Sequence, residues 1–244
     1  MLGLIEWEEG ITKPYLEPRK IMSGVFLALR LGKTSGGRFF RRRIAHLAKR
    51  MHDQGVRSAV FPADFPYETL FARQGILPVD PIPLRRALCA SYVCRRLETL
   101  GIQKDRAVIA VAAQHMGREA EETVRTLALK YRYVLVSVSS GGEAFARDML
   151  RRYGVALLLD PTEEQLDRAD ALILFSPRPD LRQENKVLCI LYPEGNLGRD
   201  DMELKLGDAI MAQAAPGCSE EQLAAALHSM GVLSTEMIKC EITC

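Results

Sequence analysis

The sequence predicts an α/β protein in which a smaller α/β lobe precedes a Rossmann-like, doubly wound, mostly parallel sheet. The main observation is a regular alternation of short apolar runs with amphipathic segments from residue 107 onward. Strands separated by helices pair in parallel through right-handed crossovers, so helices cover both faces of such a sheet. The composition agrees with a globular protein, since 48% of the 244 residues are hydrophobic, 26% are charged and the net charge is +2.

The Rossmann-like part contains apolar strands separated by helices. The expected strands cover 107–113, 133–138, 155–160, 170–176 and 186–192. The expected helices cover 117–131, 142–154 and 161–169. Helix starts here and further on carry residue pairs typical of a capping box, which satisfies free backbone amides. These pairs are Ser140 with Glu143, Asp160 with Glu163, and Ser219 with Gln222.

The pattern before residue 105 is shorter and less regular. We expect strands at 2–8, 24–31 and 58–62, the first two suited to a hairpin, and helices at 38–54, 67–75 and 81–101. Near the end of the chain we expect a strand at 208–215, a helix at 219–231 and a strand at 235–243. The predicted domains are therefore an N-terminal lobe at 1–81, a bridging helix at 82–104, a Rossmann-like domain at 105–195 and a C-terminal α/β extension at 196–244.

The sequence favours a cytoplasmic location without a membrane span. The longest apolar run, at 21–32, is shorter than the roughly 20 residues that a span needs, and it contains Arg30. The N-terminal stretch MLGLIEWEEG lacks the basic segment of a signal peptide. The six cysteines show no CxxC spacing, so we expect reduced thiols in the core and no metal site.

The stretch LGKTSGGRFFRRR at 31–43 raises the question of a phosphate-binding loop. A Walker A loop needs a glycine five positions before Gly32, and Leu27 stands there, so the fingerprint fails. The basic helix expected at 38–50 includes Arg41, Arg42 and Arg43. It could bind the phosphates of nucleic acid or anionic lipid, or simply present solvated arginines on its outer face. The near-neutral net charge argues against a dedicated nucleic-acid partner.

The first turn of the Rossmann-like sheet departs from the dinucleotide fingerprint G-x-G-x-x-G. With the third glycine on Gly117, the other two glycine positions hold Ala112 and Gln114. The Gln114 side chain stands where a pyrophosphate needs bare backbone. The second strand ends without an acid for a ribose hydroxyl, and Arg147 follows one turn later, which favours a phosphate instead. The residues at this strand end are Ser139, Ser140, Gly141 and Gly142.

Other polar residues also follow the predicted strands. Asp160 and Ser176 resemble, in their placement after the third and fourth strands, residues of the receiver domains of response regulators. Gln114 and His115 stand where such domains carry an acidic pair, so we expect neither Mg²⁺ binding nor phosphotransfer to Asp160. His115 is the histidine expected at a strand carboxyl end, where open α/β sheets bind ligands. Arg178 is a further candidate for lining that crevice.

These observations leave three hypotheses about function. The leading one is a non-catalytic ligand-sensing or partner-binding module, because each catalytic or phosphate signature lacks essential residues. The second is a divergent NAD(P)-dependent or other nucleotide-dependent enzyme, since the order of lobes is similar to that of dehydrogenases whose substrate domain precedes the nucleotide domain. Its site would contain Gln114, His115, Ser139, Ser140, Gly141, Gly142, Ser176 and Arg178. The third is anion or nucleic-acid binding through the basic helix at 38–50.

Overall fold

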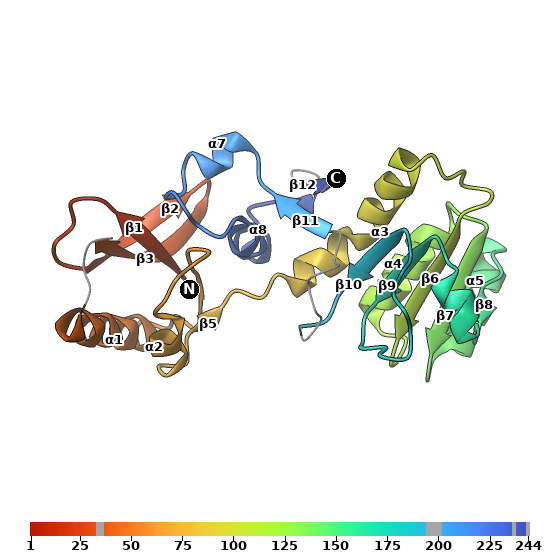
Figure 1. Cartoon of the computed structure of the whole chain (residues 1–244), viewed down its shortest axis with the longest axis horizontal. Helices are drawn as coiled ribbons and strands as arrows, with labels where there is room; N and C mark the ends of the chain where they lie inside the picture. The colour runs from red at the N-terminus through yellow and green to blue at the C-terminus, as the bar shows by residue number, and fades with distance from the viewer. Residues whose placement is uncertain (33–36, 194–201, 236–237, 243–244) are drawn as a thin grey trace. The chain divides into compact units, whose positions relative to one another are not determined.

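The computed structural model describes residues 1–32, 37–193, 202–235 and 238–242 (Figure 1). The chain forms two compact units. The first contains residues 1–81 and 204–239, and the second contains residues 82–203 and 240–244. Within the described ranges, no helix combines the length and the apolar character that crossing a membrane requires.

The first unit is built on a mixed five-stranded sheet with the order β2-β3-β1-β4-β5. Only the β2 and β3 pair is antiparallel, and the other neighbours run parallel. The strands are β1 (Leu2–Glu8), β2 (Tyr15–Ile21), β3 (Gly24–Gly32), β4 (Ser58–Val60) and β5 (Leu77–Pro78).

The hairpin predicted between 2–8 and 24–31 is wrong, because β1 and β3 are parallel neighbours. The hairpin partner of β3 is β2, which the sequence analysis did not predict. Its sequence YLEPRKI is mostly polar and contains a proline, and only its last residue is buried. Such a strand suits the edge of a sheet, where one side of its backbone needs no partner, and it carries little apolar signal.

Helices complete the first unit. α1 (Arg38–Asp53) begins where the sequence predicts, and its apolar side joins Ile5, Leu29 and Leu31 in one buried cluster. The others are α2 (Glu68–Ala72), α7 (Asp208–Met211) and α8 (Glu220–Ser229). The strand predicted at 208–215 is wrong, since α7 occupies its first four residues behind Gly207 as N-cap. β11 (Met202–Lys205) and β12 (Lys239–Ile242) form a separate two-stranded sheet.

The second unit confirms the predicted α/β class and Rossmann-like sheet. All of its strand pairs are parallel, in the order β10-β9-β6-β7-β8. Its strands are β6 (Val108–Ala113), β7 (Tyr133–Val138), β8 (Leu158–Leu159), β9 (Ala171–Leu174) and β10 (Val187–Ile190). Its helices are α3 (Ile82–Thr99), α4 (Arg118–Ala128), α5 (Gly142–Tyr153) and α6 (Glu163–Asp167). The strand order reverses between β6 and β9, which makes the carboxyl ends of these strands the topological switch point.

The capping residues differ from the prediction at two of three helices. α5 has Gly141 as its N-cap, in a left-handed conformation with φ of 84°, and no side chain caps it, so the Ser140 prediction is wrong. α6 is capped by Thr162, whose hydroxyl accepts from the Gln165 amide, so the Asp160 prediction is wrong too. Ser219 does cap α8, accepting from the amide of Gln222 as predicted.

Candidate functional site

The switch point of the second unit holds a pocket of about 370 Å³, here called the α4 pocket. Its polar lining comes from the first turn after β6, from the start of α4, from the end of β9 and from α3. These residues are Arg86, Gln114, His115, Arg118, Glu119 and Ser176. Ligands of open α/β sheets bind in the crevice outside the strand carboxyl ends at this point. The α4 pocket is therefore the first place in this fold to examine for a ligand.

Arg86 reaches the α4 pocket from α3 and is held by several contacts. Its Nε donates to the carbonyl of Leu191 at 2.9 Å, and its Nη1 lies 2.8 Å from Oε2 of Glu119. The guanidinium carbon lies 5.7 Å from the centroid of the Phe175 ring. A guanidinium fixed in this way is oriented before any ligand arrives. Sequence reasoning missed Arg86, because the helix pattern around it does not reveal which strand ends it faces.

The turn between β6 and α4 is tied to the turn between β7 and α5 by backbone hydrogen bonds. The amide of Ser139 donates to the carbonyl of Gln114 at 3.2 Å, and the amide of Met116 donates to the carbonyl of Ser140 at 3.0 Å. Gly117 is the N-cap of α4, and no side chain caps this helix. The first amides of α4 thus have no intrahelical partner, and the helix dipole makes this end favourable for an anion.

Gly117 does not act as the close-approach glycine of a dinucleotide fingerprint. Its φ is −91°, which any residue adopts, and an added Cβ would meet only the His115 ring, at 3.7 Å or more. The backbone therefore does not require glycine at this position. This agrees with the sequence result that the fingerprint fails in the first turn.

A second pocket, here called the central pocket, adjoins the α4 pocket and has a volume of about 420 Å³. The two pockets share Gln114 and Ser176, and the central pocket adds Ser137, Ser139 and Arg178. Nη1 of Arg178 donates to the Ser137 hydroxyl at 2.9 Å.

The predicted ligand residue Arg178 already has a carboxylate partner. Asp180 accepts from Nε and Nη2 of Arg178, the shorter contact being 2.6 Å. This hydrogen-bonded pairing raises the pKa of Arg178 and holds the pKa of Asp180 below its usual range. The pair carries no net charge, so Arg178 offers an incoming anion less than its sequence position suggests.

The third pocket, here called the α5 pocket, has a volume of about 350 Å³ and shares Val138 and Ser139 with the central pocket. Arg147 and Asp160 also line it. Its remaining predicted residues follow β7 along the chain: Ser140, Gly141 and Gly142.

The α5 pocket needs glycine at its two backbone positions. Gly141 has a positive φ of 84°. An added Cβ on Gly142 would lie only 2.7 Å from Cγ2 of Val138. The backbone of this pocket therefore depends on both glycines.

The structure places all eight predicted ligand residues along these three adjoining pockets. Gln114 and His115 line the α4 pocket, Ser176 lines the α4 and central pockets, and Arg178 lines the central pocket. The four residues from Ser139 to Gly142 line the α5 pocket. They meet because the carboxyl ends of parallel strands lie at one edge of the sheet.

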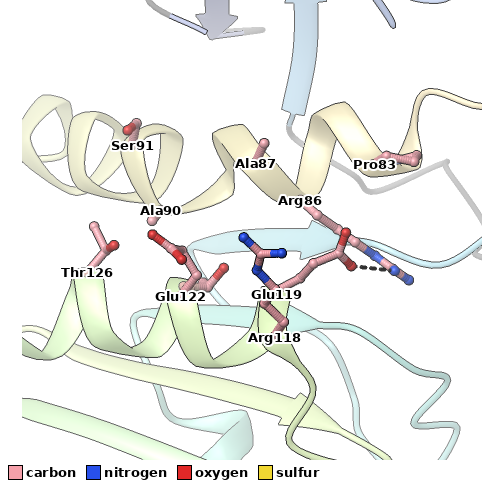
Figure 2. Close-up of a pocket in the computed structure, with 10 residues that line it drawn as sticks. Pro83, Arg86, Ala87, Ala90, Ser91, Arg118, Glu119, Glu122 and Thr126 are labelled. Carbon is pink, nitrogen blue, oxygen red and sulfur yellow. Dashed lines mark hydrogen bonds and ion pairs between the residues drawn. The ribbon is translucent and has the colours of Figure 1, made fainter. Parts of the chain in front are cut away.

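A further groove of about 370 Å³ lies between α3 and α4 in the same unit (Figure 2). Ala87, Ala90 and Ser91 of α3 line this groove together with Glu122 and Thr126 of α4. The pair of Arg86 and Glu119, drawn with a dashed line, lines both this groove and the α4 pocket. The groove exists because the side chains of α3 that line it are mostly small, and the α4 side of the groove carries acidic and polar groups.

The predicted anion-binding arginines belong to the first unit. Arg41, Arg42 and Arg43 are exposed on α1, and the guanidinium of Arg41 lies 5.9 Å from the centroid of the Tyr67 ring. Among the residues that the structure describes, no group of three or more His, Cys, Asp or Glu side chains is arranged to hold a metal ion.

No protein-family model and no curated protein matches the chain. Among solved structures, D-lactate dehydrogenase with NAD+ from Lactobacillus jensenii is 12% identical, with 60% of this chain and 53% of that chain covered and a TM-score of 0.29. L-tryptophan dehydrogenase from Nostoc punctiforme is 12% identical, with coverages of 86% and 57% and a TM-score of 0.34. The catalytic subunit of M. jannaschii aspartate transcarbamoylase is 12% identical, with coverages of 97% and 85% and a TM-score of 0.36. The chain thus spans little more than half the length of the two dehydrogenases.

Proposed function

We propose that the second unit is a ligand-binding module for a nucleotide, which it holds along the carboxyl edge of its parallel sheet without catalysing a reaction. The observation that carries this proposal is the α4 pocket at the switch point, where an oriented Arg86 and the uncapped start of α4 converge. A phosphate group is the ligand chemistry that fits a helix N-terminus beside a guanidinium.

The charges that line the α4 pocket favour an anion, although one carboxylate offsets part of the positive charge. Arg86 and Arg118 contribute two cations to the pocket, and Glu119 contributes one carboxylate that is paired with Arg86. Arg118 is exposed at the first position of α4. A bound phosphate would compete with Glu119 for Arg86 and would accept from the first amides of α4.

The length of the ligand follows from the adjoining pockets. The central pocket shares lining residues with the α4 pocket on one side and with the α5 pocket on the other. An elongated molecule can therefore occupy more than one of the three pockets. The α5 pocket offers hydroxyls of Ser139 and Ser140 and the cation Arg147 for a second polar group. This arrangement supports a nucleotide, including NADP, over a small inorganic anion.

The surroundings of His115, the histidine of the α4 pocket, support a non-catalytic role. Within the residues that the structure describes, His115 makes no hydrogen bond to a carboxylate or a hydroxyl that would orient it as a base. We also propose a reducing, cytoplasmic setting, because Cys89, Cys94 and Cys218 are buried and form no disulfide.

Ligand binding to the full chain tests the proposal directly. Thermal unfolding and calorimetric titration with NAD(H), NADP(H), ATP and inorganic phosphate should reveal at least one nucleotide that binds more tightly than phosphate alone. A ligand present at 100 times its dissociation constant stabilises the folded state by about 2.7 kcal/mol. The substitution Arg118→Gln should weaken binding, whereas Arg106→Gln, at an exposed position that lines none of these pockets, should not.

Two results would count against this function. If no nucleotide binds at millimolar concentration, the carboxyl edge is not a nucleotide site. If a bound nicotinamide nucleotide is oxidised or reduced with any added substrate, the protein is the nucleotide-dependent enzyme of the second hypothesis rather than a binding module.

A further inference from the structure

The outer face of α1 in the first unit carries a row of basic side chains with one aromatic side chain at its start. We define this outer face as Phe39, Arg42, Arg43, His46, Lys49 and Arg50. These residues recur at the three- and four-residue spacing that places side chains on one side of a helix. α1 has 16 residues, so the face extends along about 24 Å.

The aromatic residue of this face is exposed although the helix has a complete apolar side elsewhere. Phe39 is 85% exposed, whereas Phe40, the next residue, is 9% exposed and lies in the core. The apolar side of α1 is buried and consists of Phe40, Ile44, Leu47, Ala48 and Met51. Phe39 therefore contributes little to the packing of α1 against the described residues, and its exposed ring is open to stacking on a flat partner.

The charges of α1 are arranged against its own dipole. Its first turns carry Arg38 and the run from Arg41 to Arg43, with no acid in the first turn, although cations near a helix N-terminus are unfavourable. In the described ranges of the chain, no carboxylate pairs with Arg42, Arg43, Lys49 or Arg50. An external polyanion would relieve this repulsion along the whole helix.

Two kinds of polyanion suit a basic helix face, an anionic membrane and a nucleic acid. The small apolar content of the outer face favours the nucleic acid. A helix that lies on a membrane inserts an apolar side into the lipid, but the apolar side of α1 is already buried in the first unit. Only one aromatic ring remains outside. Cations that track a phosphate backbone, combined with an aromatic ring on which a base stacks, are the chemistry that binds single-stranded nucleic acid.

We infer that the outer face of α1 binds single-stranded nucleic acid, with Arg42, Arg43, Lys49 and Arg50 contacting phosphates and Phe39 stacking on a base. The overall net charge of +2 conceals this surface, because acids elsewhere in the chain balance the cations gathered on one helix. The inference concerns the first unit and is independent of the nucleotide site proposed in the second.

The test measures fluorescence anisotropy of a labelled 20-mer of deoxythymidine with the full chain at several salt concentrations. We expect binding that weakens steeply with salt. The variant Arg42→Ala with Arg43→Ala should reduce the slope of log affinity against log salt by about 1.4, since each lost phosphate contact contributes about 0.7 on a single strand. The matched control is Arg151→Ala with Arg152→Ala, which removes the same charge from exposed positions of α5 and should leave the slope unchanged.

An oligomer with abasic sites separates stacking from charge, because it keeps the phosphates and lacks the bases. Phe39→Ala should weaken binding of the deoxythymidine 20-mer by about fivefold or more and leave binding of the abasic oligomer unchanged. The exposure of Phe39 means that this variant should fold as the parent does, which a thermal unfolding curve verifies.

Several outcomes would overturn the inference. One is a failure of the protein to bind the 20-mer at 50 mM salt, and another is an α1 variant whose salt dependence equals that of the α5 control. An equal effect of Phe39→Ala on both oligomers, or none on either, would rule out stacking. Sedimentation with vesicles of phosphatidylserine and phosphatidylcholine is the remaining arm, and binding to vesicles but not to the oligomer would assign the face to lipid headgroups.

Discussion

Cys218 shows how burial controls the chemistry of a single side chain. Its thiol lies in the first unit within 3.9 Å of the Ser219 carbonyl. Burial raises its pKa to about 12, and the charges of Glu6 and Glu220 add to this effect. Because the thiolate is the reactive form, a thiol with a raised pKa reacts slowly. The reactivity of a cysteine therefore depends on its burial, which its position in the sequence does not reveal.

We predict that iodoacetamide modifies Cys218 far more slowly in the folded chain than in urea at pH 8.5. Mass spectrometry of the corresponding peptide gives both rates. The pKa in the folded state lies above the unfolded value of about 8.5. The thiol therefore contributes stability that is complete below about pH 8.5 and declines as the pH rises toward 12. Equal modification rates in the two states would contradict the burial of this thiol.

Asp180 and Arg178 provide a second residue-scale prediction, which rests on the proposed nucleotide site. Asp180→Asn removes the carboxylate that now neutralises Arg178. The guanidinium should then be available to an anionic ligand, and nucleotide affinity should increase by a few-fold in a calorimetric titration. Since both side chains are partly exposed, the free energy of unfolding should change by less than about 1 kcal/mol. Unchanged or weaker nucleotide binding would show that Arg178 does not face the ligand.

At the scale of the element, helix starts reveal which side chains stabilise the second unit. Thr162 caps α6 through a capping box. Its hydroxyl accepts from the Gln165 amide at 3.3 Å, and its own amide donates to the side-chain Oε1 of Gln165 at 2.9 Å. Ser140, one residue before the N-cap of α5, makes no capping hydrogen bond to that helix. The same type of substitution should therefore cost more stability at Thr162 than at Ser140.

We predict that Thr162→Ala lowers the free energy of unfolding by about 1 kcal/mol, the usual value of a lost N-cap. Ser140→Ala should change it by less than about 0.5 kcal/mol, as expected for an exposed position. Urea denaturation of the two variants and the parent protein gives these differences. A larger loss at Ser140 than at Thr162 would restore the capping box that the sequence suggested for α5.

Sequence patterns predicted helices and strands well where the apolar pattern lies within the element itself. α1 begins at Arg38 as its apolar periodicity indicates, and β6, β7 and β9 fall inside the predicted apolar runs. The patterns failed for β2, whose residues are mostly polar, and for α7, whose short apolar stretch suits a strand equally well. Such short segments take their conformation from the neighbours that they contact.

At the scale of the whole molecule, each compact unit has its own buried core. The first core includes Ile5, Leu29 and Ile44, and the second includes Ala110, Leu172 and Leu188. Trp7 is the single tryptophan of the chain, and its ring centroid lies 5.6 Å from that of Phe65 in the first unit. Its fluorescence therefore reports the unfolding of the first unit.

We predict that a nucleotide bound in the second unit shifts the unfolding midpoint measured by circular dichroism more than the midpoint measured by tryptophan fluorescence. Stabilisation by a ligand acts on the cooperative unit that binds it. Both signals are recorded on the same full-length sample during a thermal scan. Identical shifts in the two signals would mean that the two units unfold together.

The candidate site was predictable in part, and the reason is geometric. Gln114, His115 and Ser176 follow strands whose parallel pairing the βα alternation already implies, so their meeting at one edge required no tertiary information. Arg86 was not predictable, because its contacts with Leu191 and Phe175 join residues far apart in the chain. The neutralisation of Arg178 by Asp180 depends on the conformation of one turn, which composition does not specify.

Local patterns along the chain are enough to predict the α/β class, the parallel sheet of the second unit and the basic outer face of α1, because these follow from periodicities within single elements. The folded chain was needed to find that β1 pairs with β3 in parallel, that Thr162 rather than Asp160 caps α6, and that Arg86 reaches the switch point. Strand partners, caps and side-chain contacts depend on competition between distant parts of the chain for the same hydrogen bonds and the same buried space. A local pattern carries no record of how that competition ends.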